Sequence, residues 1–339
     1  MSNLRPVLGR LGQYTLVLAV ALMANFAIPR LAPGDPLIGI VGESGALLPA
    51  AEQRAIIHRV GLDRPLVVQF GRYLDRLAHG DLGYSYNKGR TVAGAIRERI
   101  PFTLLLLLPA ALTSAVVGVS LGVRAAWKRG SRTDVGLLGL VLALDALPAF
   151  FLGTVLLVVF AVRFPVFPVS SSIPPGMGLL TVHGVAEVAR RLALPFVTLT
   201  LTGLAPYFLT TRSAMLGSLG EDFVLMARAK GCPTRRVVHD HALRNALLPV
   251  STVFSLNLGF LLGGAVVVET VFSYPGLGRL TYDAVLARDF PMLQGTFLVF
   301  TVAVVGANLL AELAYPFLDP RVRGPRPAAD ALVDALAPA

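Results

Sequence analysis

The chain has 339 residues, of which 55% are hydrophobic and 15% are charged, and its mean hydropathy is +0.69. A soluble domain of this length cannot bury so much apolar surface, so the composition predicts a membrane protein. The net charge of +10 does not indicate nucleic-acid binding, because the basic residues lie in loops beside apolar runs, where they report membrane orientation. The single cysteine, Cys232, excludes an internal disulfide.

Six apolar stretches have about the length that crosses a bilayer as a helix. They are residues 11–29, 102–123, 135–161, 192–211, 250–272 and 292–316. Only helices satisfy their own backbone hydrogen bonds in lipid at such lengths, so we expect an all-α membrane protein with six transmembrane helices. The basic residues before the first stretch are typical of a secretory signal. The apolar run is long for one, however, and no clean A-x-A site follows, so we expect a retained first span.

The basic residues also predict the orientation of these spans. With the N-terminus in the cytosol, 15 Lys and Arg residues fall inside and five fall in the two short outer loops. The other ten lie in the long segment 30–100, and long segments are translocated largely regardless of charge. We therefore expect both termini in the cytosol and an extracytoplasmic segment after the first span.

The segment 31–100 carries its own helical pattern. Six apolar side chains fall on one helical face, namely Leu66, Val67, Phe70, Tyr73, Leu74 and Leu77. Asp81-Leu-Gly and Asn87-Lys-Gly then predict turns. The amphipathic helix is either a small cap over the membrane helices or a docking surface for an external partner.

The basic connection between the fourth and fifth spans, residues 213–249, predicts two short helices. Ser218 and Glu221 have the spacing of a capping box, which predicts the start of the first helix. Gly231 tolerates positive φ and predicts its end, and Pro233 suits the first turn of the second helix. A helix pair with apolar and basic side chains can insert into a groove on a cytosolic protein or rest on anionic membrane lipid. Composition alone leaves both interpretations open.

Nine segments of the chain carry a resemblance to a known family. ARAKG at 227–231 and HALRNALLP at 241–249 resemble the EAA loop of ABC-importer permeases, in the form found in the dipeptide/oligopeptide/nickel subfamily. The other seven are LAPGDPL at 31–37, GLDRPL at 61–66, GDLGYS at 80–85, ERIPFTLLL at 98–106, GGAVVVETVFSYPGLGRL at 263–280, ARDFP at 287–291 and LDPRVR at 318–323. The EAA pattern is only partly met, because Leu225-Met226-Ala227 occupies the EAA position.

The resemblance implies a permease subunit of a type I importer in a prokaryotic cell membrane. It implies as partners a second homologous permease, two cytosolic ATPase subunits and an extracytoplasmic substrate-binding protein. It implies di- or oligopeptides as substrates, with nickel, glutathione or another small solute as alternatives. On this basis the chain divides into an N-terminal span (1–30), the extracytoplasmic segment (31–100), a permease core (101–317) that contains the coupling loop 213–249, and a cytosolic tail (318–339).

The role of the EAA loop in the family is to seat in the ATPase, which implies a set of ATPase-coupling residues here. They are Ala227, Arg228, Ala229, Lys230, Gly231, Arg235 and Arg236. None of the three lysines follows a glycine, so the chain has no Walker A string. We therefore expect no cofactor in this chain, with ATP and Mg²⁺ bound by the partner ATPases.

Other patterns do not indicate chemistry. Gly118 to Gly122 matches the G-x-S-x-G string of hydrolases, but it lies in an apolar run and all five histidines fall outside the spans. Helix packing by small residues is the better interpretation. His239 and His241 are two residues apart and so lie on different helix faces, which does not favour a metal site. We therefore expect no metal site, and since the hydrolase string is better interpreted as packing, we expect no catalytic residue. A self-sufficient secondary transporter would need inverted repeats and paired intramembrane charges, and the sequence has no repeat.

Two acidic residues are candidates for the substrate path. Asp145 lies about eleven residues into the third span, near the bilayer midplane, where an ionised carboxylate costs at least roughly 2.5–3.5 kcal/mol. It either lines the path and attracts the amine of a passing peptide or makes a structural hydrogen bond to a neighbouring helix. Glu269, near the outer end of the fifth span, is a second candidate that would help shape an external gate.

Overall fold

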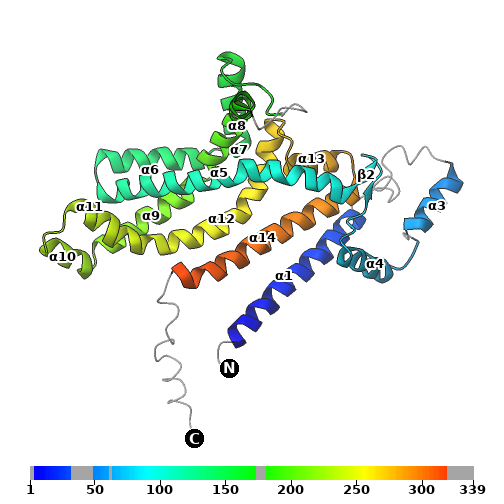
Figure 1. Cartoon of the computed structure of the whole chain (residues 1–339), viewed down its shortest axis with the longest axis horizontal. Helices are drawn as coiled ribbons and strands as arrows, with labels where there is room; N and C mark the ends of the chain where they lie inside the picture. The colour runs from blue at the N-terminus through cyan, green and yellow to red at the C-terminus, as the bar shows by residue number, and fades with distance from the viewer. Residues whose placement is uncertain (1–3, 32–48, 61–62, 173–180, 319–339) are drawn as a thin grey trace, which may run out of the picture.

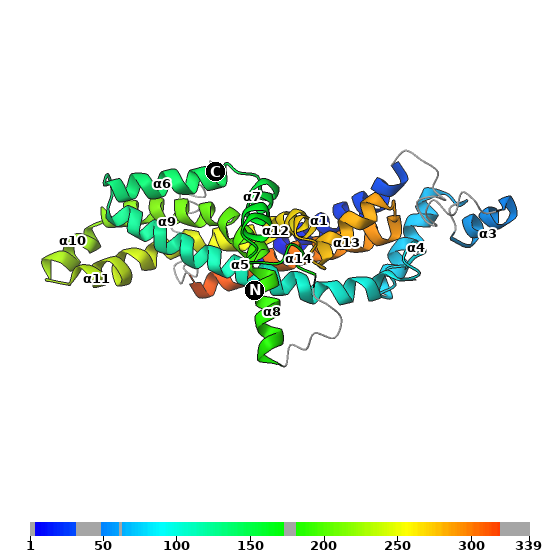
Figure 2. The ribbon, with the colours of Figure 1, turned by 90° about the horizontal axis from the view of Figure 1, so that it is seen from above.

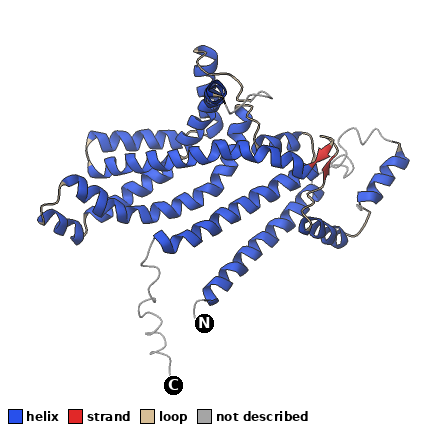
Figure 3. Ribbon diagram, viewed as in Figure 1, coloured by secondary structure: helices blue, strands red, loops and turns tan. Residues whose placement is uncertain are grey.

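The computed structural model describes residues 4–31, 49–60, 63–172 and 181–318. Most of these residues are helical, and helices and loops surround one small strand pair (Figure 3). The helices are α1 (Leu4–Leu31), α3 (Ala50–Val60), α4 (Leu66–Ala78), α5 (Val92–Trp127), α6 (Arg132–Asp145), α7 (Ala149–Leu157), η2 (Val158–Arg163), α8 (Val182–Thr202), α9 (Leu204–Leu219), α10 (Asp222–Ala229), α11 (Thr234–Arg236), η3 (Val237–Leu243), α12 (Arg244–Val271), α13 (Leu277–Leu286) and α14 (Phe290–Leu318). The predicted helical class is confirmed.

The strand pair is a departure from the all-α expectation. β1 (Tyr84–Ser85) and β2 (Arg90–Thr91) are antiparallel. Strands of two residues are too short to show the alternation of apolar and polar residues from which a strand is predicted. The turns predicted around them are confirmed, because Gly83 and Gly89 have φ values of 92° and 61°, which favour glycine. Ser85 Oγ donates a hydrogen bond to the Asp289 carboxylate, which ties this hairpin to the turn before α14.

Among the described residues, three helices are long and apolar enough to cross a membrane. They are Val92–Trp127, His183–Leu219 and Phe290–Leu309. The pair Arg132–Asp145 and Ala149–Arg163 makes a fourth if a bent pair counts as one span. The predicted first and fifth spans lie within α1 and α12. The membrane-protein class is therefore supported, and the count of six spans stays a prediction.

The third predicted span, 135–161, is not one helix. α6 ends at Asp145, α7 begins at Ala149, and the two are bent by 96° with respect to each other. The cause is Pro148, the N-cap residue of α7: proline lacks an N–H and disfavours helical geometry in the residue before it. The expectation of a continuous span was wrong because apolarity was weighed without this proline.

The helices α5 and α9 pack closely against each other. A Cβ added at Gly118 would lie 2.7 Å from Tyr207 Cβ, and one at Gly122 would lie 2.8 Å from the carbonyl oxygen of Phe208. Only glycine permits such an approach of the two backbones. Ser120 of the same string donates to the Val116 carbonyl in its own helix. The G-x-S-x-G string is thus a packing motif, as predicted.

The predicted amphipathic helix is α4, and it packs on α1 through aromatic side chains. The Tyr73 ring is buried and lies 5.7 Å from the Phe26 ring, and Asn25 Nδ2 donates to Tyr73 Oη at 3.2 Å. Leu66 and Val67, on the same predicted face, stay exposed. The described residues therefore cover only part of the apolar face of α4.

α5 runs between two ends of the molecule (Figures 1 and 2). We call one the hairpin end, where α5 follows β2 and packs on α13, and the other the α10 end, where α5 contacts η3. A helix of 36 residues is about 54 Å long at 1.5 Å per residue, which exceeds the hydrocarbon thickness of a bilayer. The two ends are therefore far enough apart to lie on opposite sides of a membrane.

Candidate functional site

The predicted coupling loop 213–249 forms a helix–turn–helix at the α10 end (Figure 1). α9 continues to Leu219, and α10 begins at Asp222 with Glu221 as its N-cap residue. The predicted capping box of Ser218 and Glu221 is wrong, because Ser218 lies in the last turn of α9. The helix end is marked instead by Gly220, which is the C-cap residue of α9.

Gly231 ends α10, as predicted. The Cys232 N–H bonds the Ala227 carbonyl at 3.2 Å, and the Gly231 N–H bonds the Arg228 carbonyl at 2.9 Å. These two bonds form a Schellman motif, which places Gly231 in the left-handed region with a φ of 74°. Pro233 is the N-cap residue of α11, and helix then continues without a break from Thr234 to Val271. The second helix of the loop is thus continuous with the predicted fifth span.

A buried apolar cluster, which we call the loop core, holds both helices of the loop against the membrane helices. Its members are Val123 and Ala126 of α5, Met215 of α9, Val224 and Ala227 of α10, Val237, Val238 and Ala242 of η3, and Ala246 of α12. Because this apolar surface is removed from water within the chain, the loop is a packed unit and not a loose tether.

The seven predicted ATPase-coupling residues divide into two groups in the structure. Arg228, Ala229, Lys230, Gly231, Arg235 and Arg236 are exposed around the turn of the loop. Ala227 is only 5% exposed and belongs to the loop core, so its side chain supports the loop from within. The spacing of apolar residues in the sequence could not distinguish the buried Ala227 from the six exposed residues, because the apolar residues of α10 occur on more than one side of the helix.

The structure also shows exposed apolar residues on α10 that were not among the predicted site residues. Leu225 and Met226 are 56% and 59% exposed, whereas the adjacent Val224 is buried. Exposed apolar side chains that are grouped on one short helix are typical of a contact surface. Beside them the Arg228 guanidinium lies 5.5 Å from the centroid of the Trp127 ring, a cation–π contact that ties α10 to the end of α5. The loop therefore presents an apolar patch flanked by basic residues.

Asp145 is exposed in this chain and lies at the C-terminal end of α6, at the bend before Pro148. It makes no hydrogen bond or ion pair with another described residue. Irregular backbone at membrane depth is tolerated where it lines protein or a watered cavity. The structure thus places Asp145 at a break between two helices, instead of within a continuous one.

Glu269 is fully buried near the end of α12, at the hairpin end. Its carboxylate accepts a hydrogen bond from Thr103 Oγ1 of α5 at 2.7 Å and another from the Arg279 N–H at 3.0 Å. Arg279 lies in the first turn of α13, where an unpaired N–H group needs an acceptor. Glu269 therefore caps α13 from another helix.

The turn between α12 and α13 is built around this carboxylate. A Cβ at Gly278 would lie 2.9 Å from Glu269 Oε2 and 2.5 Å from Val266 Cα, so only glycine fits. Tyr274 Oη donates to the Phe102 carbonyl at 2.7 Å, and Arg99 donates to the Pro275 carbonyl at 3.1 Å. The segment ETVFSYPGLG at 269–278 is thus fixed to α5 at several points.

No group of three His, Cys, Asp or Glu side chains that could hold a metal ion occurs in the described part of the chain. What the geometry defines is a helical membrane protein with a packed loop at one end and a fixed turn at the other.

Comparisons with known proteins agree with this class. Residues 118–324 match the family described as binding-protein-dependent transport system inner membrane component. The chain is similar to the di/tripeptide transport system permease protein DppB of Pseudomonas aeruginosa (strain UCBPP-PA14), with 39% identity over 90% of this chain and 94% of the relative. It is also similar to the dipeptide transport system permease protein DppB of Escherichia coli (strain K12), with 36% identity over 94% of this chain and 99% of the relative.

The fold and the comparisons together define a membrane permease subunit of a transport system. The chain belongs to the family of inner membrane components of binding-protein-dependent transport systems. The resemblance to ABC-importer permeases of the dipeptide/oligopeptide/nickel subfamily is confirmed.

Proposed function

We propose that this chain is one of two related permease subunits that form the membrane path of an ATP-driven importer of di- and oligopeptides. It crosses a prokaryotic cell membrane six times, with both termini in the cytosol and residues 31–100 outside. The names of the two relatives, both given for di- or tripeptide transport, support short peptides as the substrate. The exposed apolar faces of α5 and α6, including Leu112, Val116 and Val135, suit lipid and the second permease.

Two cytosolic ATPases dock on the coupling loops, one on each permease. The exposed patch of Leu225, Met226 and the basic residues that flank them inserts into a groove on the ATPase. The observation that carries this proposal is the loop core, because a loop packed on α5 and α9 transmits a push to the membrane helices. A loose loop would absorb the same displacement. ATP and Mg²⁺ are bound by the ATPases and not by this chain.

The transport cycle follows from this attachment. When ATP closes the two ATPases, the loops move together and carry the ends of α5, α9 and α12 with them. The path then opens outward and accepts peptide from the substrate-binding protein, which docks at the hairpin end. Hydrolysis separates the ATPases and returns the helices to the inward-facing arrangement. The energy source lies outside the chain.

Two acidic residues act in this path. Asp145, at the bend between α6 and α7, attracts the amine of a passing peptide. Glu269 shapes the outer gate indirectly, because its carboxylate caps α13 and so determines where that helix lies.

The proposal is tested by purification through a tag on this chain after mild detergent extraction. We expect ATPase subunits and a second permease to co-purify, and we expect the isolated chain to transport nothing in proteoliposomes. Peptide transport by the isolated chain would contradict the proposal.

Substitution at the turn of the loop sharpens this test. Gly231→Val places a β-branched residue at a φ of 74°, which distorts the turn, and we expect at least roughly tenfold less ATPase to co-purify while membrane insertion is unchanged. Gly130→Val is the matched control, because Gly130 has a φ of 75° and equally open surroundings but lies between α5 and α6. Equal loss of ATPase from both variants would show that the effect is not specific to the loop.

A further inference from the structure

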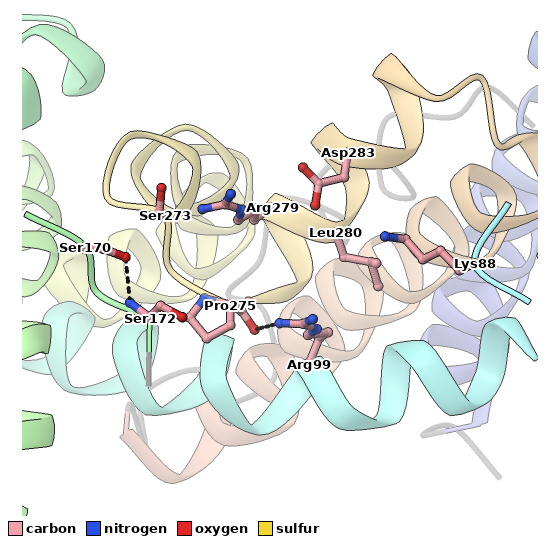
Figure 4. Close-up of a pocket in the computed structure, with 10 residues that line it drawn as sticks. Lys88, Arg99, Ser170, Ser172, Ser273, Pro275, Arg279, Leu280 and Asp283 are labelled. Atoms are coloured by element: carbon pink, nitrogen blue, oxygen red, sulfur yellow. Dashed lines mark hydrogen bonds between the residues drawn. The ribbon is translucent and has the colours of Figure 1, made fainter. Parts of the chain in front are cut away.

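A pocket of about 480 Å³ lies at the hairpin end, where four segments distant in sequence meet (Figure 4). Lys88 comes from the turn between β1 and β2, Arg99 from α5, and Ser170 and Ser172 from the segment before α8. The remaining wall is the turn after α12 and the part of α13 that extends to Asp283. Pockets of this volume are in the usual range for small-molecule sites.

The pocket combines three cations with one carboxylate. Lys88, Arg99 and Arg279 reach it from three different segments, and Asp283 lies on the same wall as Arg279 (Figure 4). Within the described part of the chain, none of these three cations forms an ion pair with an acidic side chain. Arg99 is held by the Pro275 carbonyl at 3.1 Å, whereas the side chains of Lys88 and Arg279 are not committed to a protein acceptor in the same described residues. Three cations that face a shared space with one carboxylate leave an excess of positive charge, which favours a ligand with an anionic group.

One wall of the pocket is rigid. The Arg279 N–H is bonded to the Glu269 carboxylate, and the neighbouring Leu277 N–H is bonded to Thr103 Oγ1 at 2.7 Å. These bonds fix the backbone from which the Arg279 side chain extends. A preorganised cation binds an anion at lower entropic cost than one on a mobile loop.

We propose that this pocket binds a short peptide with free termini, with the peptide carboxylate on Lys88, Arg99 and Arg279 and the peptide amine on Asp283. Guanidinium and ammonium groups donate charge-assisted hydrogen bonds to a carboxylate, and an aspartate accepts them from an amine. The hydroxyls of Ser170 and Ser172 are positioned to meet the polar peptide backbone. This inference rests on the proposed import function and adds a peptide subsite within the permease, at its outer entrance.

The test is peptide binding to the intact importer complex in nanodiscs, without binding protein, by titration calorimetry. The probes are alanyl-alanine, its C-terminal amide and its N-acetyl form. Because a hydrogen bond to a charged group is lost, we expect Lys88→Gln and Arg279→Gln each to weaken binding of alanyl-alanine roughly tenfold or more. The C-terminal amide should bind the unmodified complex as weakly as alanyl-alanine binds these two variants. Asp283→Asn should weaken alanyl-alanine but not the N-acetyl form.

Arg97→Gln is the matched control, since Arg97 is an exposed arginine of α5 outside the pocket lining, and it should leave binding unchanged. Lys88 lies in an exposed turn, so its variant keeps the test valid if Arg279→Gln impairs assembly. Equal affinity of the unmodified complex for alanyl-alanine and its amide would overturn the inference. So would variants that weaken only the binding protein's attachment, which would make the pocket a protein-docking surface.

The proposed function is measured separately by dipeptide uptake with binding protein and ATP present. Uptake by the unmodified complex together with no binding to the pocket would refute the subsite alone. Absence of dipeptide uptake would refute the import function itself.

Discussion

The carboxylate of Glu269 occupies the space that a side chain at Gly276 would need. A Cβ at position 276 would lie 2.2 Å from both Cδ and Oε1 of Glu269, closer than any real contact. The buried acid and the glycine seven residues later are therefore one structural feature, which joins α12, α13 and α5 at the hairpin end.

Gly276→Ala should destabilise the chain, because the added methyl group displaces the Glu269 carboxylate from its two donors. Overpacking of this kind costs typically about 1–3 kcal/mol, and the loss of buried hydrogen bonds adds to it. Gly217→Ala is the control, since a Cβ there meets nothing within 4 Å in helix α9, and it should be neutral or slightly stabilising. The check is the thermal unfolding midpoint of the complex in detergent. Equal midpoints for the two variants would contradict the assignment.

Thr103→Val should also destabilise the turn, whereas Thr103→Ser should not. Thr103 Oγ1 donates to Glu269 and accepts from the Leu277 N–H, so valine leaves two buried polar groups unpaired at about 1–3 kcal/mol each. Thr154→Val removes only a bond to the Phe150 carbonyl within an exposed helix and serves as the control. The same unfolding measurement distinguishes them; a normal midpoint for Thr103→Val would refute the bridging role.

Arg212→Met should loosen the attachment of α6 to α9. Arg212 Nε and Nη2 donate to Asp134 Oδ1 and Oδ2 at 2.7 and 2.9 Å, and Asp134 is buried. Removing one partner of such a pair leaves an uncompensated buried charge, which can lower the free energy of unfolding by up to about 3–5 kcal/mol. The loss is smaller where water reaches the pair, as it does at the partly exposed Arg212. A double-mutant cycle with Asp134→Asn measures the coupling. Additive effects of the two substitutions would mean that the pair contributes nothing.

Leu225→Asp and Val224→Asp are adjacent substitutions with opposite expected results. Leu225 is exposed, so its variant should fold normally but lose ATPase association by at least roughly tenfold, because a charge enters an apolar contact. Val224 is fully buried in the loop core, so its variant should lower the unfolding midpoint. Retention of ATPase by the Leu225 variant would show that the outer face of α10 is not the contact surface.

Asp145→Leu tests the path residue. We expect normal assembly and a reduced transport rate for peptides with a free amine, measured in proteoliposomes. Asp222 is an exposed acid on α10, outside the proposed path. The Asp222→Leu variant therefore shows whether loss of a negative charge at the coupling loop alone changes transport. If Asp145→Leu leaves both assembly and transport unchanged, Asp145 does not line the path.

The sequence alone predicted several features that depend on local chemistry, although the capping box of Ser218 and Glu221 was wrong. Gly231 and Pro233 identified the turn of the coupling loop, because only certain residues tolerate those backbone conformations. Gly118 and Gly122 were correctly interpreted as a packing surface. In each case the residue type itself carries the signal.

Features that depend on contacts between distant segments could not be predicted in the same way. The relationship of Glu269 to Gly276 needs the α12–α13 turn in three dimensions, and the burial of Ala227 depends on where α5 and α9 pass. The break after Asp145 differs from these, because it could have been predicted from the sequence. Pro148 is present there, and proline disfavours helical geometry in the residue before it in any protein.

Thiol labelling at the coupling loop shows directly on which side of the membrane the loop lies and whether ATPase covers it. Ala229→Cys, in a Cys232→Ser background, places a single thiol on the exposed face beside Lys230. If the loop lies in the cytosol, a membrane-impermeant maleimide labels this thiol only after the cells are opened, and bound ATPase then blocks the labelling. Labelling in intact cells would place the loop outside and contradict its role as the ATPase contact.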